Sequence, residues 1–139
     1  MNLRPTILID LSSEYIDFTF KKQSIRFAAY MNMRIHEGEV VPIAIGEKRE
    51  YPSSILLGIY DFDEITKYNL EKTALLKLMM DYGIGKLFEK LWYPPRRPLV
   101  IFRGHKNLAG MLGGEYQKTL EQVAIQAQAW KVEFESAGD

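Results

Sequence analysis

The residues best suited to chemistry lie in the segment TILIDLSSEYIDFTF, residues 6 to 20. An apolar run reaches Asp10, the chain then crosses Ser12 and Ser13, and an alternating run follows. Serine hydroxyls and backbone amides in such a turn can hold a phosphate, and the carboxylate can hold a divalent cation. The turn can also do no more than join two strands. These three uses are the hypotheses for this segment.

Asp10 is the candidate magnesium ligand, because it is a carboxylate at the end of an expected central strand. A hydrolase with two metal ions needs three or four carboxylates that converge on the ions. The acids available to join Asp10 are Asp17, Glu64 and Glu133. After the later apolar run PLVIF the chain carries Arg103 and His105 in place of an acid, which argues against such a hydrolase.

A glycine-containing segment and two histidines could be taken for ligand sites, but each has a simpler interpretation. Residues 108 to 114, LAGMLGG, do not have P-loop spacing and lack its lysine and its serine or threonine. We interpret them as a mobile connection with an exposed contact point at Leu108, Met111 and Leu112. His36 and His105 lie in separate expected turns without metal-type spacing, so we expect both to be solvated.

Composition narrows the classes of partner. The 139 residues hold 18 basic and 18 acidic side chains, so no net field draws the chain to nucleic acid or to an anionic membrane. The absence of cysteine excludes disulfides and thiolate metal sites and fits a cytoplasmic setting. The apolar runs fall short of the ~20 residues that span a bilayer, and the N-terminal residues MNLRPT contain no apolar stretch of signal length.

The first third of the sequence has the apolar pattern of strands. Residues 6–11 form an unbroken apolar run typical of a central strand, and residues 15–20 alternate as a second strand of a hairpin. Residues 24–35 alternate throughout and predict one long, half-exposed strand near an edge. A turn at residues 36–39 leads to a fourth strand over residues 40–45, which Pro42 keeps at an edge or a bulge. We expect an antiparallel meander.

The pattern then changes to helices and buried strands. Asp61 and Glu64 have capping-box spacing, and helical periodicity runs from Leu70 to Trp92, with Gly83 and Gly85 expected to break or bend the helix. Residues 98–104 predict a buried strand. The last expected elements are a helix bearing Tyr116, Leu120, Val123, Ala124 and Ala127, and a strand over residues 131–136. The expected class is α/β, a single domain over residues 1–139 with a mixed sheet of five or more strands and helices packed on it, as in the ribonuclease H-like fold.

Several segments, taken in order, are similar to one known family. The segment ILIDLSSEYIDFTF is similar to that family's IDLGT strand, turn and second strand, and EGEVVPIAIGEK is similar to its GEV…VG segment. IYDFDEITKYNLEKTALLKLMM resembles the entry into its first long helix, and RPLVIFRG resembles its RP-x-V-V-I-G strand. The chain thus resembles the first half of the bacterial actin homologue MreB, the rod shape-determining protein.

The resemblance implies a vestigial phosphate turn at Asp10, Ser12 and Ser13, with Mg-ATP as the corresponding cofactor. It also places Glu115 about where the family carries the glutamate that positions the attacking water, although the helix dipole alone favours an acid there. The family's phosphate turn is glycine-rich, whereas LSSE contains no glycine. Glu14 would repel the phosphate by about 4 kcal/mol at ~4 Å and an effective dielectric near 20, enough to remove micromolar affinity.

The resemblance covers only the first half of a fold that closes nucleotide between two halves. We therefore expect no ATP hydrolysis by this chain alone, and a non-catalytic, cytoplasmic actin-like domain that acts through protein contacts in bacterial cell-shape or cytoskeletal assembly. Contacts are expected at the exposed face of residues 24–35 and the edge near Pro42, with a dimer as the simplest form. The alternatives are a metal-dependent ribonuclease H-like phosphodiester hydrolase and a degenerate remnant without a ligand.

Overall fold

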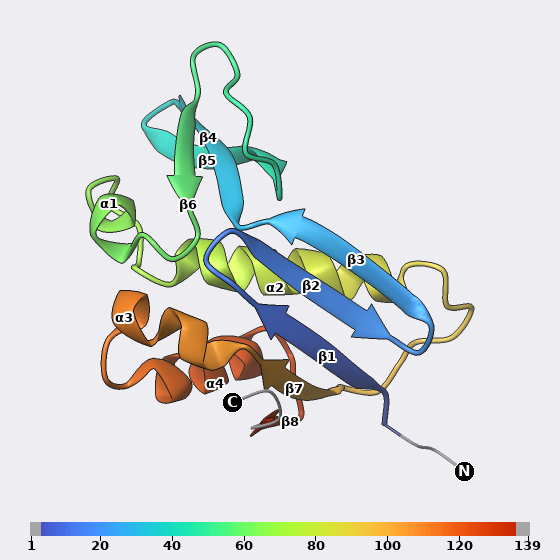
Figure 1. Cartoon of the computed structure of the whole chain (residues 1–139). Helices are drawn as coiled ribbons and strands as arrows, with labels where there is room; N and C mark the ends of the chain where they lie inside the picture. Colours follow the sequence, from blue (N-terminus) through green and yellow to red (C-terminus); the bar gives the residue numbers. More distant parts are fainter. Residues whose placement is uncertain (1–3, 136–139) are drawn as a thin grey trace.

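A five-stranded mixed sheet forms the larger part of the fold in a computed structural model that describes residues 4–135 (Figure 1). Its strand order is β3-β2-β1-β7-β8, with β1 in the centre. The strands are β1 (Thr6–Leu11), β2 (Tyr15–Phe20), β3 (Gln23–Ala28), β7 (Leu99–Arg103) and β8 (Lys131–Phe134). β1, β2 and β3 pair antiparallel, whereas β7 runs parallel to both β1 and β8. This confirms the α/β class and the mixed sheet; Ser136, the end of the expected last strand, lies outside the described residues.

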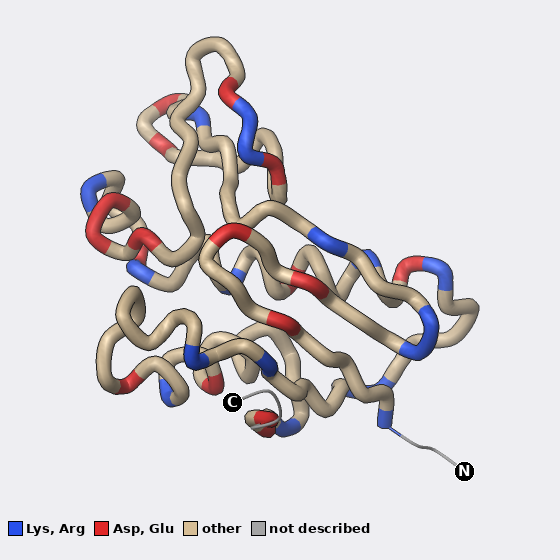
Figure 2. Tube along the Cα trace, viewed as in Figure 1, with Lys and Arg blue, Asp and Glu red and all other residues tan. Residues whose placement is uncertain are grey.

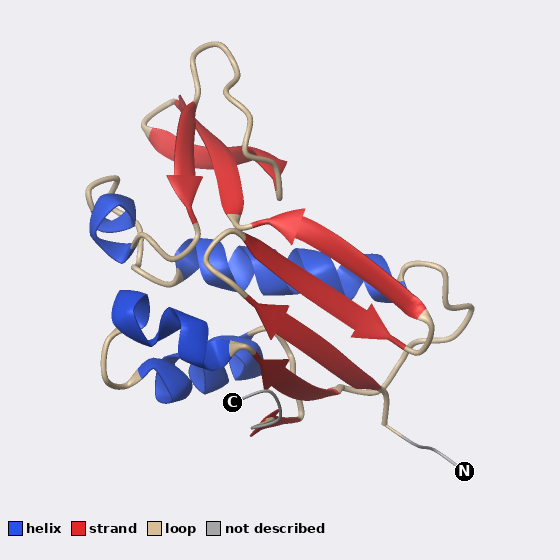
Figure 3. Cartoon of the chain, viewed as in Figure 1, coloured by secondary structure: helices blue, strands red, loops and turns tan. Residues whose placement is uncertain are grey.

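The two faces of this sheet have different environments. Successive side chains of a strand point to opposite faces, and in β1 the core face carries Ile7, Ile9 and Leu11, all buried. The other face carries Asp10 of β1 and Asp17 of β2, which are paired in register and mark the two neighbouring acidic positions on the strands in Figure 2. No helix of the described chain lies over this second face, which is turned toward the viewer (Figure 3).

The helices pack on the core face (Figure 3). α2 (Ala74–Phe88) lies against β2 and β3, and α4 (Tyr116–Gln126) lies against β8. The expected break at the two glycines of α2 was wrong, because the helix runs through both. Gly83 is required for packing, since a Cβ atom there would lie 2.4 Å from the ring of buried Phe18. Gly85 is exposed and would meet nothing within 4 Å.

A second, three-stranded sheet has the order β5-β4-β6. Its strands are β4 (Tyr30–His36), β5 (Glu39–Ile45) and β6 (Ile55–Gly58). The single long strand expected over residues 24–35 was wrong: it divides at Ala29 into β3 of the large sheet and β4 of the small one. The backbone explains the division, because the Ala29 amide donates to Glu14 O at 2.9 Å while its carbonyl accepts from Ile59 N at 3.0 Å. Pro42 lies in edge strand β5 beside a register irregularity, as predicted.

Short helices precede both long helices in the sequence. The carboxylate of Asp61 accepts a hydrogen bond from the Glu64 amide at 3.5 Å and begins α1 (Phe62–Thr66). The predicted capping box is only half formed, since Glu64 itself pairs with Lys67 at 2.8 Å. η1 (His105–Leu108) and α3 (Ala109–Leu112) occupy much of the segment expected to be a mobile connection.

Three predictions of exposure were wrong. Leu108, expected to belong to an exposed contact point, is fully buried at the end of η1. His105 is buried, because it packs against the rings of Tyr116 and Phe134. Trp92, expected on the apolar side of a long helix, lies beyond the end of α2 and is 92% exposed. No helix among residues 4–135 is long and apolar enough to cross a membrane.

Candidate functional site

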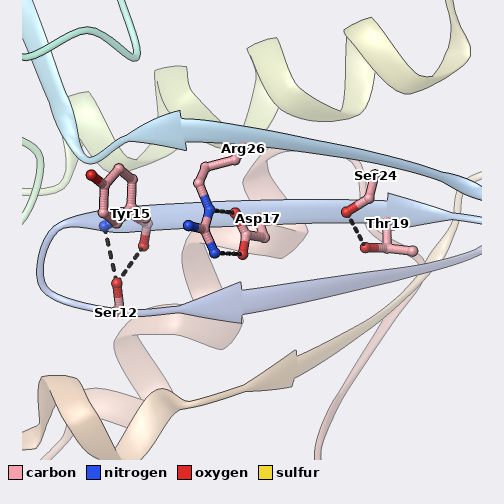
Figure 4. A network of polar contacts seen from close by, with 6 residues as sticks. All are labelled: Ser12, Tyr15, Asp17, Thr19, Ser24 and Arg26. Carbon is pink, nitrogen blue, oxygen red and sulfur yellow. Dashed lines mark hydrogen bonds and ion pairs between the residues drawn. The ribbon is translucent and has the colours of Figure 1, made fainter.

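The turn between β1 and β2 is closed by its own hydrogen bonds (Figure 4). The Ser12 hydroxyl accepts from the Tyr15 amide at 3.0 Å and lies 3.1 Å from the Tyr15 carbonyl, to which it donates. The Ser12 amide also donates to the Tyr15 carbonyl at 3.0 Å. The predicted hairpin is therefore confirmed. Two of the polar groups that an anion would need are already satisfied within the turn.

Glu14 of this turn binds neighbouring side chains. Its carboxylate accepts hydrogen bonds from the Tyr30 hydroxyl at 3.1 and 3.3 Å, and it pairs with the Lys48 ammonium at 3.5 Å. The Lys48 ammonium lies 4.8 Å from the centre of the Tyr30 ring. Hydrogen bonding to Tyr30 and the charge of Glu14 raise the pKa of Lys48. The turn is thus tied to the small sheet and to the segment after β5.

Ser13 lines a cavity of 380 Å³ beside the turn. The cavity lies between the turn, α1, α3 and the base of the small sheet, and its lining residues are Ser13, Ala29, Tyr30, Gly58, Tyr60, Asp61, Phe62, Asp63 and Met111. Burial raises the pKa of Tyr60, so its phenol is neutral and adds no charge. The formal charges in the lining are those of two aspartates, which repel a phosphate.

The C-terminal end of β7 closes against the same turn. Gly104 has φ +68°, and a Cβ atom there would lie 2.4 Å from the carbonyl oxygen of Leu11. The side-chain amide of Asn107 donates to that carbonyl at 3.3 Å. The sequence interpretation missed this contact, for which the glycine between a strand and a helix was the available signal. The approach of Gly104 and the hydrogen bond from Asn107 together hold the Leu11 carbonyl at the end of β1 in place.

Asp10 lies on the face of the sheet that carries no helix. Its neighbours in register are Asp17 on β2 and Arg103 on β7. Asp17 is held by Arg26 through two bonds of 2.8 and 3.0 Å, drawn in Figure 4, and this contact raises the pKa of Arg26. Arg103 instead forms an ion pair of 3.2 Å with Glu135, without hydrogen-bond alignment. A row of charged side chains, from Arg26 on β3 to Glu135 after β8, therefore runs across the sheet at the level of Asp10.

The acids required by the hydrolase alternative do not converge. Glu64 lies on α1 and pairs with Lys67, and Glu133 lies on β8 and pairs with Lys131 at 3.6 Å. Between residues 4 and 135 no group of three or more histidine, aspartate or glutamate side chains is placed to hold a metal ion. Only Asp10 and Asp17 are brought together. The residues present do not fit a two-metal centre.

Glu115 lies away from the turn. It occupies the N-cap position of α4, is exposed, and makes no side-chain capping bond. It lines two depressions at the start of α4 and is absent from the lining of the cavity beside Ser13. The residue that this region contributes to the cavity is Met111 of α3. The roles proposed for Asp10, Ser12, Ser13 and Glu115 stay predictions.

A mixed β3-β2-β1-β7-β8 sheet, with a small sheet inserted between β3 and α2, defines the class of this protein as α/β with an actin-like fold. Among solved structures, MreB5 of Spiroplasma citri bound to ADP matches 97% of this chain with a TM-score of 0.65 and 11% identity. The same protein bound to AMPPNP matches 97% with a TM-score of 0.63 and 14% identity. Such identities show the fold alone.

This chain spans 39% of the length of either solved chain. No protein-family model matches the sequence. A search of curated proteins also finds no match. The likeness supports an actin-like fold without a specific assignment to MreB.

Proposed function

We propose that this chain is a non-catalytic actin-like domain that acts through protein contacts in cytoskeletal or cell-shape assembly, with self-association as the simplest form. The observation that carries the proposal is the closed β1–β2 turn, in which the Ser12 hydroxyl is bonded to Tyr15. A turn that cradles phosphate presents several free amide donors. Here the turn contains no glycine and faces an acidic cavity.

The fold likeness supports the cytoskeletal part of the proposal. The two solved MreB5 structures hold ADP and AMPPNP, so a nucleotide belongs to those proteins. For this chain we propose that function depends on contacts with other protein chains and not on a bound nucleotide. The absence of cysteine supports a cytoplasmic setting.

The small sheet offers the contact surface. Its edge strand β5 exposes unpaired backbone groups, and exposed apolar side chains flank them: Ile35 on β4 is 57% exposed and Ile43 on β5 is 38% exposed. Edge strands of this kind pair readily with a second chain. We therefore place the self-association surface on β4 and β5, near Pro42.

Sedimentation velocity over a series of protein concentrations tests this function. The mean sedimentation coefficient is expected to rise with concentration and to be the same with and without Mg-ATP. Ile35→Lys should reduce the rise, because a lysine on this surface opposes pairing. Ile125→Lys is the matched control, since Ile125 is 46% exposed on α4. A rise that requires nucleotide, or no rise at any concentration, would contradict the proposal.

A further inference from the structure

A groove of 630 Å³ lies at the opposite end of β1 from the candidate turn. It is bounded by Arg4 and Pro5 before β1, by the β2–β3 turn at Lys21, and by residues 91–96 after α2. In Figure 1 the start of β1, the β2–β3 turn and the segment after α2 meet at this end of the sheet. We call it the basic groove.

The charged side chains of the basic groove are all cationic. They are Arg4, Lys21 and Arg96, and no acidic residue is part of the lining. Figure 2 shows mostly basic positions around this end of the sheet, with one acidic position directly after α2. That residue, Glu89, is not part of the groove lining and pairs with Lys86 at 3.6 Å. The chain has no net charge, so the positive field is local and favours an anionic ligand.

The interior of the groove is apolar and restrained. Phe20 is only 7% exposed and meets Phe88 edge-on, with 5.2 Å between ring centres. The Leu91 amide donates to the Phe88 carbonyl at 3.1 Å, which fixes the start of the opposite wall. Pro94 and Pro95 follow in that wall, and proline has a fixed φ. A restrained groove loses little entropy when it binds.

We propose that the basic groove binds an extended acidic segment of a partner protein that carries one aromatic or large aliphatic side chain. The acidic side chains meet Arg4, Lys21 and Arg96, and the apolar side chain enters between Phe20 and Leu91. The volume lies within the range of roughly 300–1,000 Å³ found for ligand sites. A concave site suits a chain segment better than a flat bilayer, and exposed Trp92 is not part of the lining. The inference rests on the proposed function, since it names the chemistry of a protein partner.

The test is fluorescence polarisation with a fluorescein-labelled decapeptide of aspartate and glutamate with one central phenylalanine. We expect saturable binding that weakens as salt is added, because exposed charges are screened. A peptide with lysine in place of the acids, and one with glycine in place of phenylalanine, should bind weakly or not at all. Equal binding of the acidic and basic peptides, or no binding of the acidic one, would overturn the proposal.

Charge reversal locates the site. The double variant Lys21→Glu and Arg96→Glu should weaken peptide binding about tenfold. The variant loses two exposed ion pairs with the acidic peptide, and its new glutamates repel the peptide's carboxylates. Lys118→Glu, an exposed position on α4 outside this groove, is the matched control and should bind as the parent does. Both reversed residues are exposed, and Lys21 keeps a non-glycine side chain at its φ of +56°. Circular dichroism checks that the variant is folded.

Two other occupants have distinct outcomes. If vesicles of equal parts phosphatidylcholine and phosphatidylserine bind and the peptide does not, with binding lost in Trp92→Ala, the surface is a membrane site and the proposal is wrong. If saturating acidic peptide lowers the sedimentation coefficient of the self-associated protein, the groove is occupied by a second copy and the proposal is also wrong. Neither outcome depends on whether Mg-ATP binds, so failure here is separable from failure of the proposed function.

Discussion

Replacing Gly104 by alanine is expected to lower the free energy of unfolding by about 3 kcal/mol. A left-handed backbone costs a non-glycine residue about 1–2 kcal/mol, and Gly104 has φ +68° and ψ +8°. The new Cβ atom would also lie 2.4 Å from the carbonyl oxygen of Leu11, which cannot move without disturbing β1. Such overpacking costs typically about 1–3 kcal/mol. Urea unfolding followed by circular dichroism measures the loss.

Gly38→Ala is the matched control for the backbone contribution. Gly38 also has a positive φ, +82°, but a Cβ atom there would meet nothing within 4 Å. Its loss should be about 1–2 kcal/mol, from the backbone alone. Equal losses in the two variants would show that the close approach of Gly104 to the end of β1 does not exist in solution.

Gly83→Ala and Gly85→Ala should change stability in opposite directions, although both lie in α2. Alanine is favoured over glycine inside a helix by about 1 kcal/mol, so Gly85→Ala should stabilise the protein by up to that amount. At Gly83 the new methyl group would lie 2.4 Å from two atoms of the Phe18 ring. Because Phe18 is fully buried, we expect a net loss of about 1–2 kcal/mol, again from urea unfolding.

A double-mutant cycle attributes the loss at Gly83 to the Phe18 ring. Phe18→Leu removes the atoms that the new methyl group would meet, so Gly83→Ala should cost less in that background than in the parent. The difference between the two costs is the coupling free energy of the pair. Equal costs in both backgrounds, or stabilisation by Gly83→Ala, would contradict the close packing of α2 on β2.

Local patterns were sufficient to predict the elements that short-range physics determines. The hairpin of β1 and β2, the buried strand β7 and the capped start of α1 all follow from alternation, apolar runs and side-chain chemistry within a few residues. The resemblance to actin-like chains in order and spacing pointed to the same fold. The mixed sheet confirms that part of the interpretation.

The errors came from partners distant in the sequence. Alternation over residues 24–35 continues without a break, yet Ala29 bonds to both Glu14 and Ile59, and the strand changes sheet there. His105 follows a strand as a turn residue would, but Tyr116 and Phe134 bury it. A period of two or 3.6 residues carries no information about such contacts.

The candidate site was harder to predict than the fold. The cavity beside Ser13 is lined by residues from the turn, the small sheet, α1 and α3, and spacing along the chain does not reveal such a combination. The sequence did identify the missing glycines and the charge of Glu14. It did not show that Tyr30 and Lys48 bind that charge, because both lie beyond the hairpin.

Calorimetric titration of the purified chain with Mg-ATP measures whether the β1–β2 turn can hold a nucleotide. We expect no binding, or binding only at millimolar concentrations, because the β1–β2 turn is closed on itself and the adjoining cavity carries Asp61 and Asp63. Micromolar binding in a 1:1 ratio would contradict this expectation, most clearly if Asp10→Asn abolished that binding. Ser12 and Ser13 would then be acting in place of the missing glycines.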